Sequence, residues 1–548
     1  MKEGFRQSMS WLHTWIGLVA GWVLYFVYLT GTLGYLDKEI DYWMTPDRPA
    51  FVQPGTPQQQ VQVAQDHLQQ VAPQAASWNI QLIGGREAPS LDVSWTDRVQ
   101  GAAAGSAEGP MAAARPVTHK ETLDPRTGKP VDYNARATGG GQVLYKMHYQ
   151  LAYIPYDKAI LVIMVFTLIM FAAMVTGIIV HKNIFKDFFT FRPGKGQRSW
   201  LDGHNFLSVT ALPFHLIVTY SGFLFFTYQF MPSVPHLVYG DGRQAGLAFY
   251  QGTYPYPSPT LPQATHVGAP LVSFAPMLDA ADQSWGKDNI SAVEVRNPGD
   301  ANARVLVKPQ ETVSIPFPEN MLVFDGANGR LLQDFRPGHH GPGTTDHVMK
   351  GLHKGLFANW WLRILLLFMG VGGTAMIGTG LLLWANTRRT RLLAAKQPLH
   401  FGIWLVDRLN VGAIIGMPIA IAAYFWANRL LPVELATRAN WEVHAMYLTM
   451  AAMFAWPMVR PYERVRIEML WLCAAAYGLL PVLNMLTTTR GLNHSIAQGD
   501  WIMAGFDLTA LGCAAFAAWC AVRARRSMAN VTLRRRPRAA AVAEPVAS

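Results

Sequence analysis

The sequence predicts a mostly α-helical membrane protein with about eight transmembrane helices and two soluble α+β domains on one side of the membrane. Of its 548 residues, 51% are hydrophobic and only 15% are charged, which is too apolar for an ordinary soluble protein. The apolar residues gather in runs of about 20, the length that a helix needs to cross a bilayer. Basic residues lie on alternate sides of successive runs, and this pattern sets the orientation.

Eight apolar runs are long enough to span a membrane. They lie at roughly 12–36, 159–181, 203–230, 361–386, 403–427, 441–459, 467–487 and 501–522. The first run is longer than the apolar part of a signal peptide and lacks a convincing cleavage site, so we expect it to remain as a span. The three cysteines all fall inside predicted spans, so we expect neither disulfides nor a cysteine metal site.

The net charge of +11 is concentrated in three short connections, near 182–198, 388–396 and 460–466, and in the tail after 523. Because cytoplasmic loops are enriched in Lys and Arg, both termini are expected in the cytoplasm of a bacterial inner membrane. The long segments are then periplasmic. Clusters of this kind orient the protein or contact lipid, so we expect no nucleic-acid partner.

These expectations divide the chain into seven parts. They are a first transmembrane helix (1–36), a first periplasmic domain (37–158), the second and third helices with a basic cytoplasmic loop (159–230), a second periplasmic domain (231–360), a fourth helix (361–390), a C-terminal four-helix region (391–523) and a basic cytoplasmic tail expected to be disordered (524–548). Each outer domain should hold a helix (61–72, 276–285), strands (80–83, 91–95; 292–295, 304–307) and an Asp-to-Gly turn (124–128, 325–329). The Ala- and Gly-rich stretch 101–116 is expected to be flexible.

The first four spans carry the same features twice, in the order histidine, span, outer domain, histidine, span. A Thr-Gly or Ser-Gly pair recurs in each of these spans. The matched features are His13 and Thr30-Gly31 with His204 and Ser221-Gly222, then His148 and Thr176-Gly177 with His353 and Thr379-Gly380. We therefore expect a duplicated unit of helix, outer domain and helix, which the last four spans lack.

Histidines in or beside the first four spans are the candidate functional residues, because ionisable groups at membrane depth are costly and usually serve a purpose. They are His13, His181 and His204 at the cytoplasmic edge, His215 in mid-span, and His148 and His353 at the outer edge. Neutral imidazoles on facing helices suit haem b, whose iron takes two axial nitrogens. Histidines at both edges permit two haems and an electron path across the membrane.

A lone histidine at a helix end is more often a hydrogen-bonding residue than a ligand. The duplication favours ligation for His13 with His204 and for His148 with His353, because matched positions can converge on one axis. His181 has a weaker case, since it lies at the interface beside a lysine.

The remaining histidines have simpler interpretations. His339 and His340 lie in a Gly-rich loop near the outer surface and could touch a substrate or a metal, although a solvated loop is the simpler interpretation. His400, His444 and His494 are expected to be structural.

Together these features resemble the PepSY-associated transmembrane family over about residues 5–390. The resemblance rests on the Trp-Leu-His13 opening, the outer domains with their turns, the His148 and Leu352-His353 elements, the Thr-Gly helices and above all the run Phe191-Arg-Pro-Gly-Lys-Gly-Gln-Arg-Ser-Trp200-Leu-Asp-Gly-His204-Asn205. It implies PepSY-like outer domains and an inner-membrane protein of iron uptake, in the better-understood members a di-haem b ferric-siderophore reductase. It implies haem-bearing histidines at His13, His148, His204, His215 and His353, less surely at His181, and leaves their pairing open. The four-span tail looks like a longer subgroup.

The favoured hypothesis is therefore a haem-dependent reductase of ferric iron, held by a siderophore or another chelate, at the periplasmic face. The electron donor is a quinol or a separate reductase, because the sequence shows no flavin or nicotinamide domain. Candidate residues for holding an anionic chelate are His339, His340, Lys354 and Arg363. Two alternatives stay open: a non-enzymatic regulator whose outer domains bind a peptide or partner, and a transporter of a siderophore or metal.

Overall fold

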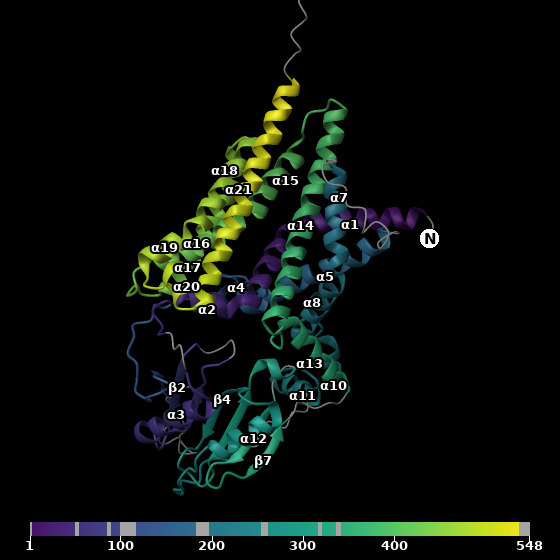
Figure 1. Cartoon of the computed structure of the whole chain (residues 1–548). Coiled ribbons are helices and arrows are strands. Elements are labelled where there is room, and N and C mark those ends of the chain that lie inside the picture. The colour runs from purple at the N-terminus through teal and green to yellow at the C-terminus, as the bar shows by residue number, and fades with distance from the viewer. Residues whose placement is uncertain are drawn as a thin grey trace, which may run out of the picture.

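The computed structural model describes residues 3–49, 54–84, 89–98, 117–181, 197–253, 261–315, 320–335 and 341–535. A bundle of long helices carries a β-sheet at one end, and the last helix ends at the other (Figure 1). These two ends are called the sheet end and the tail end below. The stretch 101–116, expected to be flexible, lies outside the described residues, as do His339 and His340.

Six helical segments of the described chain are long and apolar enough to cross a membrane. They are α1 (Glu3–Leu33) continued by η1 (Gly34–Leu36) and α2 (Asp37–Met44), then α5 (Tyr156–Val180), α14 (Trp360–Ala394), α15 (Phe401–Val411) joined to α16 (Met417–Leu430), α18 (Tyr462–Gly478) with α19 (Leu480–Thr487), and α21 (Trp501–Arg535). The chain is therefore a multi-pass membrane protein.

The expected third span is a bent pair of helices. Helices α7 (Gln197–Thr210) and α8 (Leu212–Phe225) meet at an angle of 65° and together are apolar enough to count as a seventh span. The physical reason is Pro213, which lies in the first turn of α8 and cannot continue the α7 hydrogen-bond ladder.

The prediction of eight spans is not confirmed within the described residues. The segment 441–459 does form a helix, α17 (Arg438–Val459), but this helix is not among those apolar enough to cross alone. Its first turns hold Arg438 and Glu442, which are buried as an ion pair inside the bundle. These charged residues lower the mean hydropathy of α17, so its composition alone does not identify it as a span.

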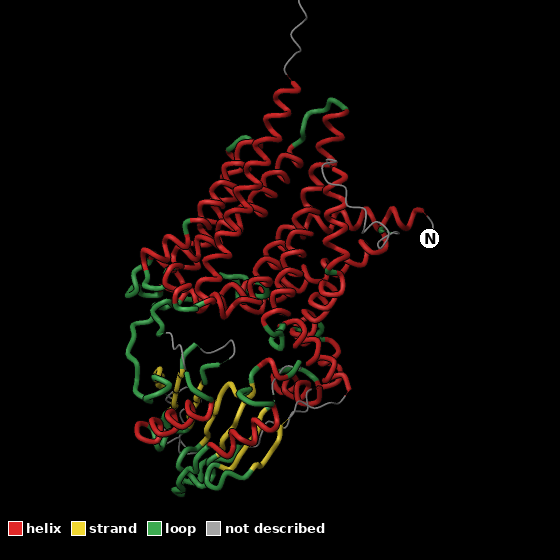
Figure 2. The backbone as a smooth tube through the Cα atoms, viewed as in Figure 1, coloured by secondary structure: helices red, strands yellow, loops and turns green. Residues whose placement is uncertain are grey.

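The two outer segments contribute strands to one sheet, so the expected count of two outer domains is not confirmed (Figure 2). Seven described strands lie in the order β3-β2-β1-β4-β5-β6-β7. The first segment supplies β1 (Ser77–Gln81), β2 (Leu91–Thr96) and β3 (Thr118–Leu123); the second supplies β4 (Ile290–Arg296), β5 (Arg304–Pro309), β6 (Met321–Asp325) and β7 (Leu331–Phe335). The seam is the antiparallel pair β1 and β4, in which Ile80 faces Val293.

One hydrophobic core also joins the two outer segments. Helix α3 (Pro57–Val71) and helix α12 (Ala275–Trp285) pack together, and both contribute to a buried cluster that includes Leu68, Trp78, Leu278 and Val293. The two expected Asp-to-Gly turns are present, each with a main-chain bond from the glycine N–H to the aspartate carbonyl at 2.9 Å. The halves match in their local order, but they share an interior and form a single folding unit.

The duplication is visible in the helices. Helix α1 packs on α5 and on α4 (Gly140–Met147), and correspondingly α7 packs on α14 and α8 packs on α13 (Gly341–Lys354). After α8 the second half adds the short helices α9 (Thr227–Phe230), α10 (Ser233–Tyr239) and α11 (Arg243–Thr253). The helix contacts of the second repeat thus match those of the first.

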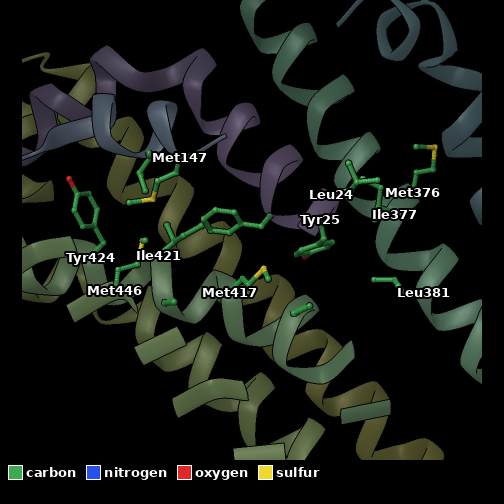
Figure 3. Close-up of a cluster of buried hydrophobic side chains, with 14 of the residues drawn as sticks. Leu24, Tyr25, Met147, Met376, Ile377, Leu381, Met417, Ile421, Tyr424 and Met446 are labelled. Carbon is green, nitrogen blue, oxygen red and sulfur yellow. The ribbon is translucent and has the colours of Figure 1, made fainter. Parts of the chain in front are cut away.

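The C-terminal region packs against both halves of the duplicated unit, since α15 contacts α14 and α21 contacts α2. Leu24 and Tyr25 of α1, Leu381 of α14 and Met417 of α16 belong to one buried cluster (Figure 3). At the sheet end α17 and α16 contact the chain just before α4: Glu442 accepts a hydrogen bond from the Thr138 hydroxyl. The region ends with α20 (Leu492–Ala497) and α21, and α21 continues as a helix to Arg535, through the first part of the expected tail.

Candidate functional site

His13 and His204 form the first of two histidine pairs, here called the tail-side pair. Their ring centroids are 6.5 Å apart. His13 Nδ1 lies 2.9 Å from the Ala173 carbonyl oxygen on α5, and His204 Nδ1 lies 2.9 Å from the Met376 carbonyl oxygen on α14. A carbonyl can only accept, so Nδ1 carries the proton in both rings and Nε2 keeps its lone pair.

His148 and His353 form the sheet-side pair, with ring centroids 6.1 Å apart and planes inclined by 27°. His148 Nδ1 donates to the Tyr145 carbonyl. His353 Nδ1 lies 2.8 Å from the hydroxyl oxygen of Ser221, whose own proton goes to the Ile217 carbonyl, so His353 is the donor. Nε2 is again the nitrogen left with a lone pair.

Burial keeps the sheet-side rings uncharged. Removal from water lowers the pKa of His148 below its usual value and lowers the pKa of His353 to about 3. Both rings are therefore neutral at physiological pH, the form in which imidazole ligates a metal.

The glycines of the repeated Thr-Gly and Ser-Gly pairs each lie against one of the four paired histidines. A Cβ on Gly177 would lie 3.2 Å from Cε1 of His13, and a Cβ on Gly380 would lie 3.2 Å from Cε1 of His204. At the sheet end a Cβ on Gly31 would lie 3.6 Å from Cβ of His148, and one on Gly222 would lie 3.9 Å from Cε1 of His353, which are ordinary contacts. Gly177 and Gly380 therefore make room for the tail-side rings, whereas the sheet-side glycines only adjoin theirs.

The two pairs lie near opposite ends of the same helices. His13 and Gly31 are 18 residues apart on α1, and Gly31 contacts His148 of the other pair. At 1.5 Å per residue the two levels are about 27 Å apart along α1, close to the thickness of a bilayer core. The matched histidines from both repeats thus converge at two depths.

A cavity of about 450 Å³ contains the sheet-side pair. Both histidines line it, together with apolar side chains of α1, α5 and α8. Towards the sheet end the lining becomes polar, with Lys38, Gln142 and Lys354. The volume and the mostly apolar wall are those of a cofactor or small-molecule site.

His215 lies between the two levels and breaks the symmetry of the repeat. It is 1% exposed, and within the described chain neither ring nitrogen has a hydrogen-bond partner. Its ring packs edge-on against Tyr28, with centroids 5.7 Å apart, and a Cβ on Gly373 would lie 2.7 Å from its Cε1. A buried imidazole with both nitrogens free is costly unless a ligand satisfies it.

The other predicted residues lie outside these pairs. His181 follows α5, and its Nε2 is buried without a partner in the described chain. Lys354 borders the cavity, next in sequence to His353. Arg363 is 6% exposed and is held by Glu39 and the Ala358 carbonyl, and it does not line the cavity.

The histidines expected to be structural behave differently from the pairs. His444 accepts or donates one hydrogen bond with Tyr153 near the sheet end of the bundle, and His494 bonds to the Thr489 carbonyl. Neither is brought near a second histidine by a ring contact.

Sequence reasoning did not identify Ser221, Tyr28 or Gly373 as site residues. Ser221 had a usable signal, because it belongs to the repeated Thr/Ser-Gly pair. Gly373 had none, since several glycines share α14 and spacing does not tell which one faces a ring.

The donor set fits haem better than a bare metal ion. The described residues contain no group of three or more His, Cys, Asp or Glu placed to hold a metal, so an ion at either pair would need ligands from elsewhere. A porphyrin supplies four nitrogens and leaves two axial positions. His13 with His204 would hold one haem and His148 with His353 a second, and haem iron would supply one-electron chemistry at each pair.

A family model described as the PepSY-associated TM region matches residues 10–387. The match contains both histidine pairs and ends before the C-terminal region. Among curated proteins nothing matches.

Proposed function

The chain belongs to the PepSY-associated TM family, and from this membership and its paired histidines we propose a haem b electron-transfer protein that reduces ferric iron at the sheet end. The iron is held by a siderophore or another chelate. The sheet end faces the periplasm and the tail end faces the cytoplasm of a bacterial inner membrane, since the basic connections at 388–396 and 460–466 lie at the tail end.

The observation that carries the proposal is the convergence of four histidines into two pairs. Each ring is fixed by an Nδ1–H hydrogen bond and presents Nε2, which is the usual arrangement of a metal-bound histidine. Haem b held by each pair would supply an iron centre that takes up and releases one electron at a time. A regulator or a transporter has no evident need for two matched, neutral pairs at two depths.

The chain contributes positioning and exclusion of water. The carbonyl and hydroxyl acceptors lock the four ring orientations, so little reorganisation accompanies a change of charge in the site. Electrons from a quinol or a separate reductase enter at the tail-side pair. His215 lies between the two levels, buried and with both ring nitrogens free within the described chain, and would be a further ligand for a cofactor there.

The sheet end supplies the substrate side. Lys38 and Lys354 at the polar border of the cavity give positive charge near an anionic chelate. Arg363, His339 and His340 complete the candidates named from the sequence. Reduction releases the iron because oxygen chelators prefer the harder ferric ion.

A vesicle assay tests this function. The full-length haem-loaded protein is reconstituted into vesicles with dithionite trapped inside, and a ferric trihydroxamate and a ferrous-specific chelator are added outside. We expect ferrous iron to appear outside with the wild type and not with His13→Ala or His353→Ala. Equal rates in protein-free vesicles, or in both variants, would refute transmembrane reduction.

A further inference from the structure

A second cavity lies at the tail end, away from both histidine pairs. It has a volume of about 340 Å³ and is formed between the end of α14, the start of α15 and the start of α18. Its lining combines charged, aromatic and aliphatic side chains: Arg389, Arg408, Asp407, Glu463, Trp404, Tyr462, Leu393 and Leu399. Both leucines are exposed.

The charges around this cavity leave one arginine uncompensated. Arg389 pairs with Asp407, and Arg466 pairs with Glu463, so two guanidinium groups are matched by two carboxylates. In the part of the chain that the structure describes, Arg408 has no ion-pair or hydrogen-bond partner, and its Nε is buried. Its guanidinium lies 4.7 Å from the centroid of the Trp404 ring. An arginine that lines a cavity and has no hydrogen-bond acceptor in the described chain can donate to an anion there.

The level of the cavity matches the membrane surface. The apolar part of α14 ends at the basic residues Arg388, Arg389 and Arg391. Asp407 pairs with Arg389, so Arg408, the next residue, lies at the same level. Trp and Tyr side chains are typical of this depth. Leu393 and Leu399 extend the cavity along an apolar wall.

We propose that this cavity binds the phosphate group of an anionic phospholipid, with Arg408 as the main contact and the leucine wall along the acyl chains. Arginine suits phosphate because its planar fork donates two parallel hydrogen bonds. Basic pockets between helices at the cytoplasmic side are used in this way by membrane proteins. The residues Trp404, Arg408 and Tyr462 lie beyond the matched family region, so the site belongs to the C-terminal region of this chain.

Native mass spectrometry of the delipidated full-length protein tests the proposal. Phosphatidylglycerol and phosphatidylcholine are titrated onto the wild type, and we expect one phosphatidylglycerol to bind preferentially. Arg408→Gln should weaken phosphatidylglycerol binding about tenfold and leave phosphatidylcholine unchanged. The matched control is Arg526→Gln, which removes the same charge from an exposed position of α21 and should bind like the wild type.

A second variant and a competition experiment test the same site independently of Arg408→Gln. Leu399→Trp keeps every charge but fills the cavity, so it should also lose the preferential lipid even if Arg408→Gln does not fold. Inorganic phosphate at millimolar concentration should not displace the lipid; complete displacement would identify a soluble phosphate ligand and overturn the lipid assignment. Equal losses in Arg408→Gln and Arg526→Gln, or no loss in Arg408→Gln and Leu399→Trp, would overturn the site.

Discussion

At the scale of the residue, the proposed haem chemistry rests on four histidines whose Nδ1 is held by the backbone or by a hydroxyl. Replacing one member removes an axial ligand from its pair and leaves the other pair intact. We expect His13→Ala and His353→Ala each to lose about one of two haems, because the levels are about 27 Å apart and independent.

Haem content per chain, measured by pyridine haemochrome, checks this prediction. The control is His494→Ala, a half-exposed ring with a single carbonyl contact, which should keep both haems. If His494→Ala lost as much haem as His353→Ala, the argument from duplication would fail.

Gly380 offers a test that leaves every histidine in place. Its Cβ would lie 3.2 Å from Cε1 of His204, so the branched side chain in Gly380→Val must push the ring aside. We expect loss of the tail-side haem, with the sheet-side haem retained, seen as halved Soret absorbance. Gly17→Val in α1 is the matched control, since a Cβ there meets nothing within 4 Å.

Asp300 links stability of the sheet to pH. Burial raises its pKa, but hydrogen bonds from Asn302, Thr265 and His266 lower it by more, so its pKa lies well below the usual 3.8. A depressed carboxyl pKa stabilises the fold above pH 3.8, and this contribution is lost as the pH falls through the folded value.

Asp300→Asn should therefore destabilise the protein by about 2 kcal/mol at pH 6 and by less at pH 3. Thermal unfolding at the two pH values measures the difference between wild type and variant. A difference that stays constant with pH would mean that the ionised carboxylate is not the stabilising group.

At the scale of the element, helices and strands with a periodic apolar pattern could be predicted, but their packing against one another could not. Helix α3, helix α12 and strands β2, β4 and β5 fall where their patterns predict, whereas β1 begins three residues before the expected 80–83 and ends at Gln81. The bend between α7 and α8 was missed because Pro213 lies in an otherwise apolar run, where composition alone suggests one span. Strands β3, β6 and β7 were missed because their partners, rather than their own patterns, define them.

Helix α4 depends on the C-terminal region for its position. The Tyr424 hydroxyl on α16 donates to the Gly140 carbonyl at 2.9 Å, at the start of the helix that ends at His148. Tyr424→Phe should lower affinity for the sheet-side haem a few-fold, by loosening this helix, and leave the tail-side haem unchanged.

Tyr477→Phe is the matched control, because Tyr477 also donates to a carbonyl at 2.9 Å, that of Pro418, within the C-terminal region. Both variants should lose about 1 kcal/mol of stability. Haem titration of each apoprotein separates the two effects, and equal affinities in the two variants would show that α16 does not position His148.

At the scale of the whole molecule, the duplication could be predicted from the sequence, but the way in which the two repeats join could not. Matched histidines and Thr/Ser-Gly pairs predicted a repeated unit, and the structure brings both pairs together. The joining of the outer segments through β1 and β4 could not be read, because Ile80 and Val293 are buried equally well in one sheet or in two. The same holds for the ion pair of Arg438 with Glu442, whose burial depends on helices distant in sequence.

The central claim is that one chain holds two haems b, one at each histidine pair. The most direct measurement is the absorption spectrum of the purified wild-type protein, oxidised and then reduced with dithionite, together with its haem-to-protein ratio. We predict a sharp reduced α band of the b type and about two haems per chain. A folded, monodisperse and colourless protein that takes up no added haem would contradict the account.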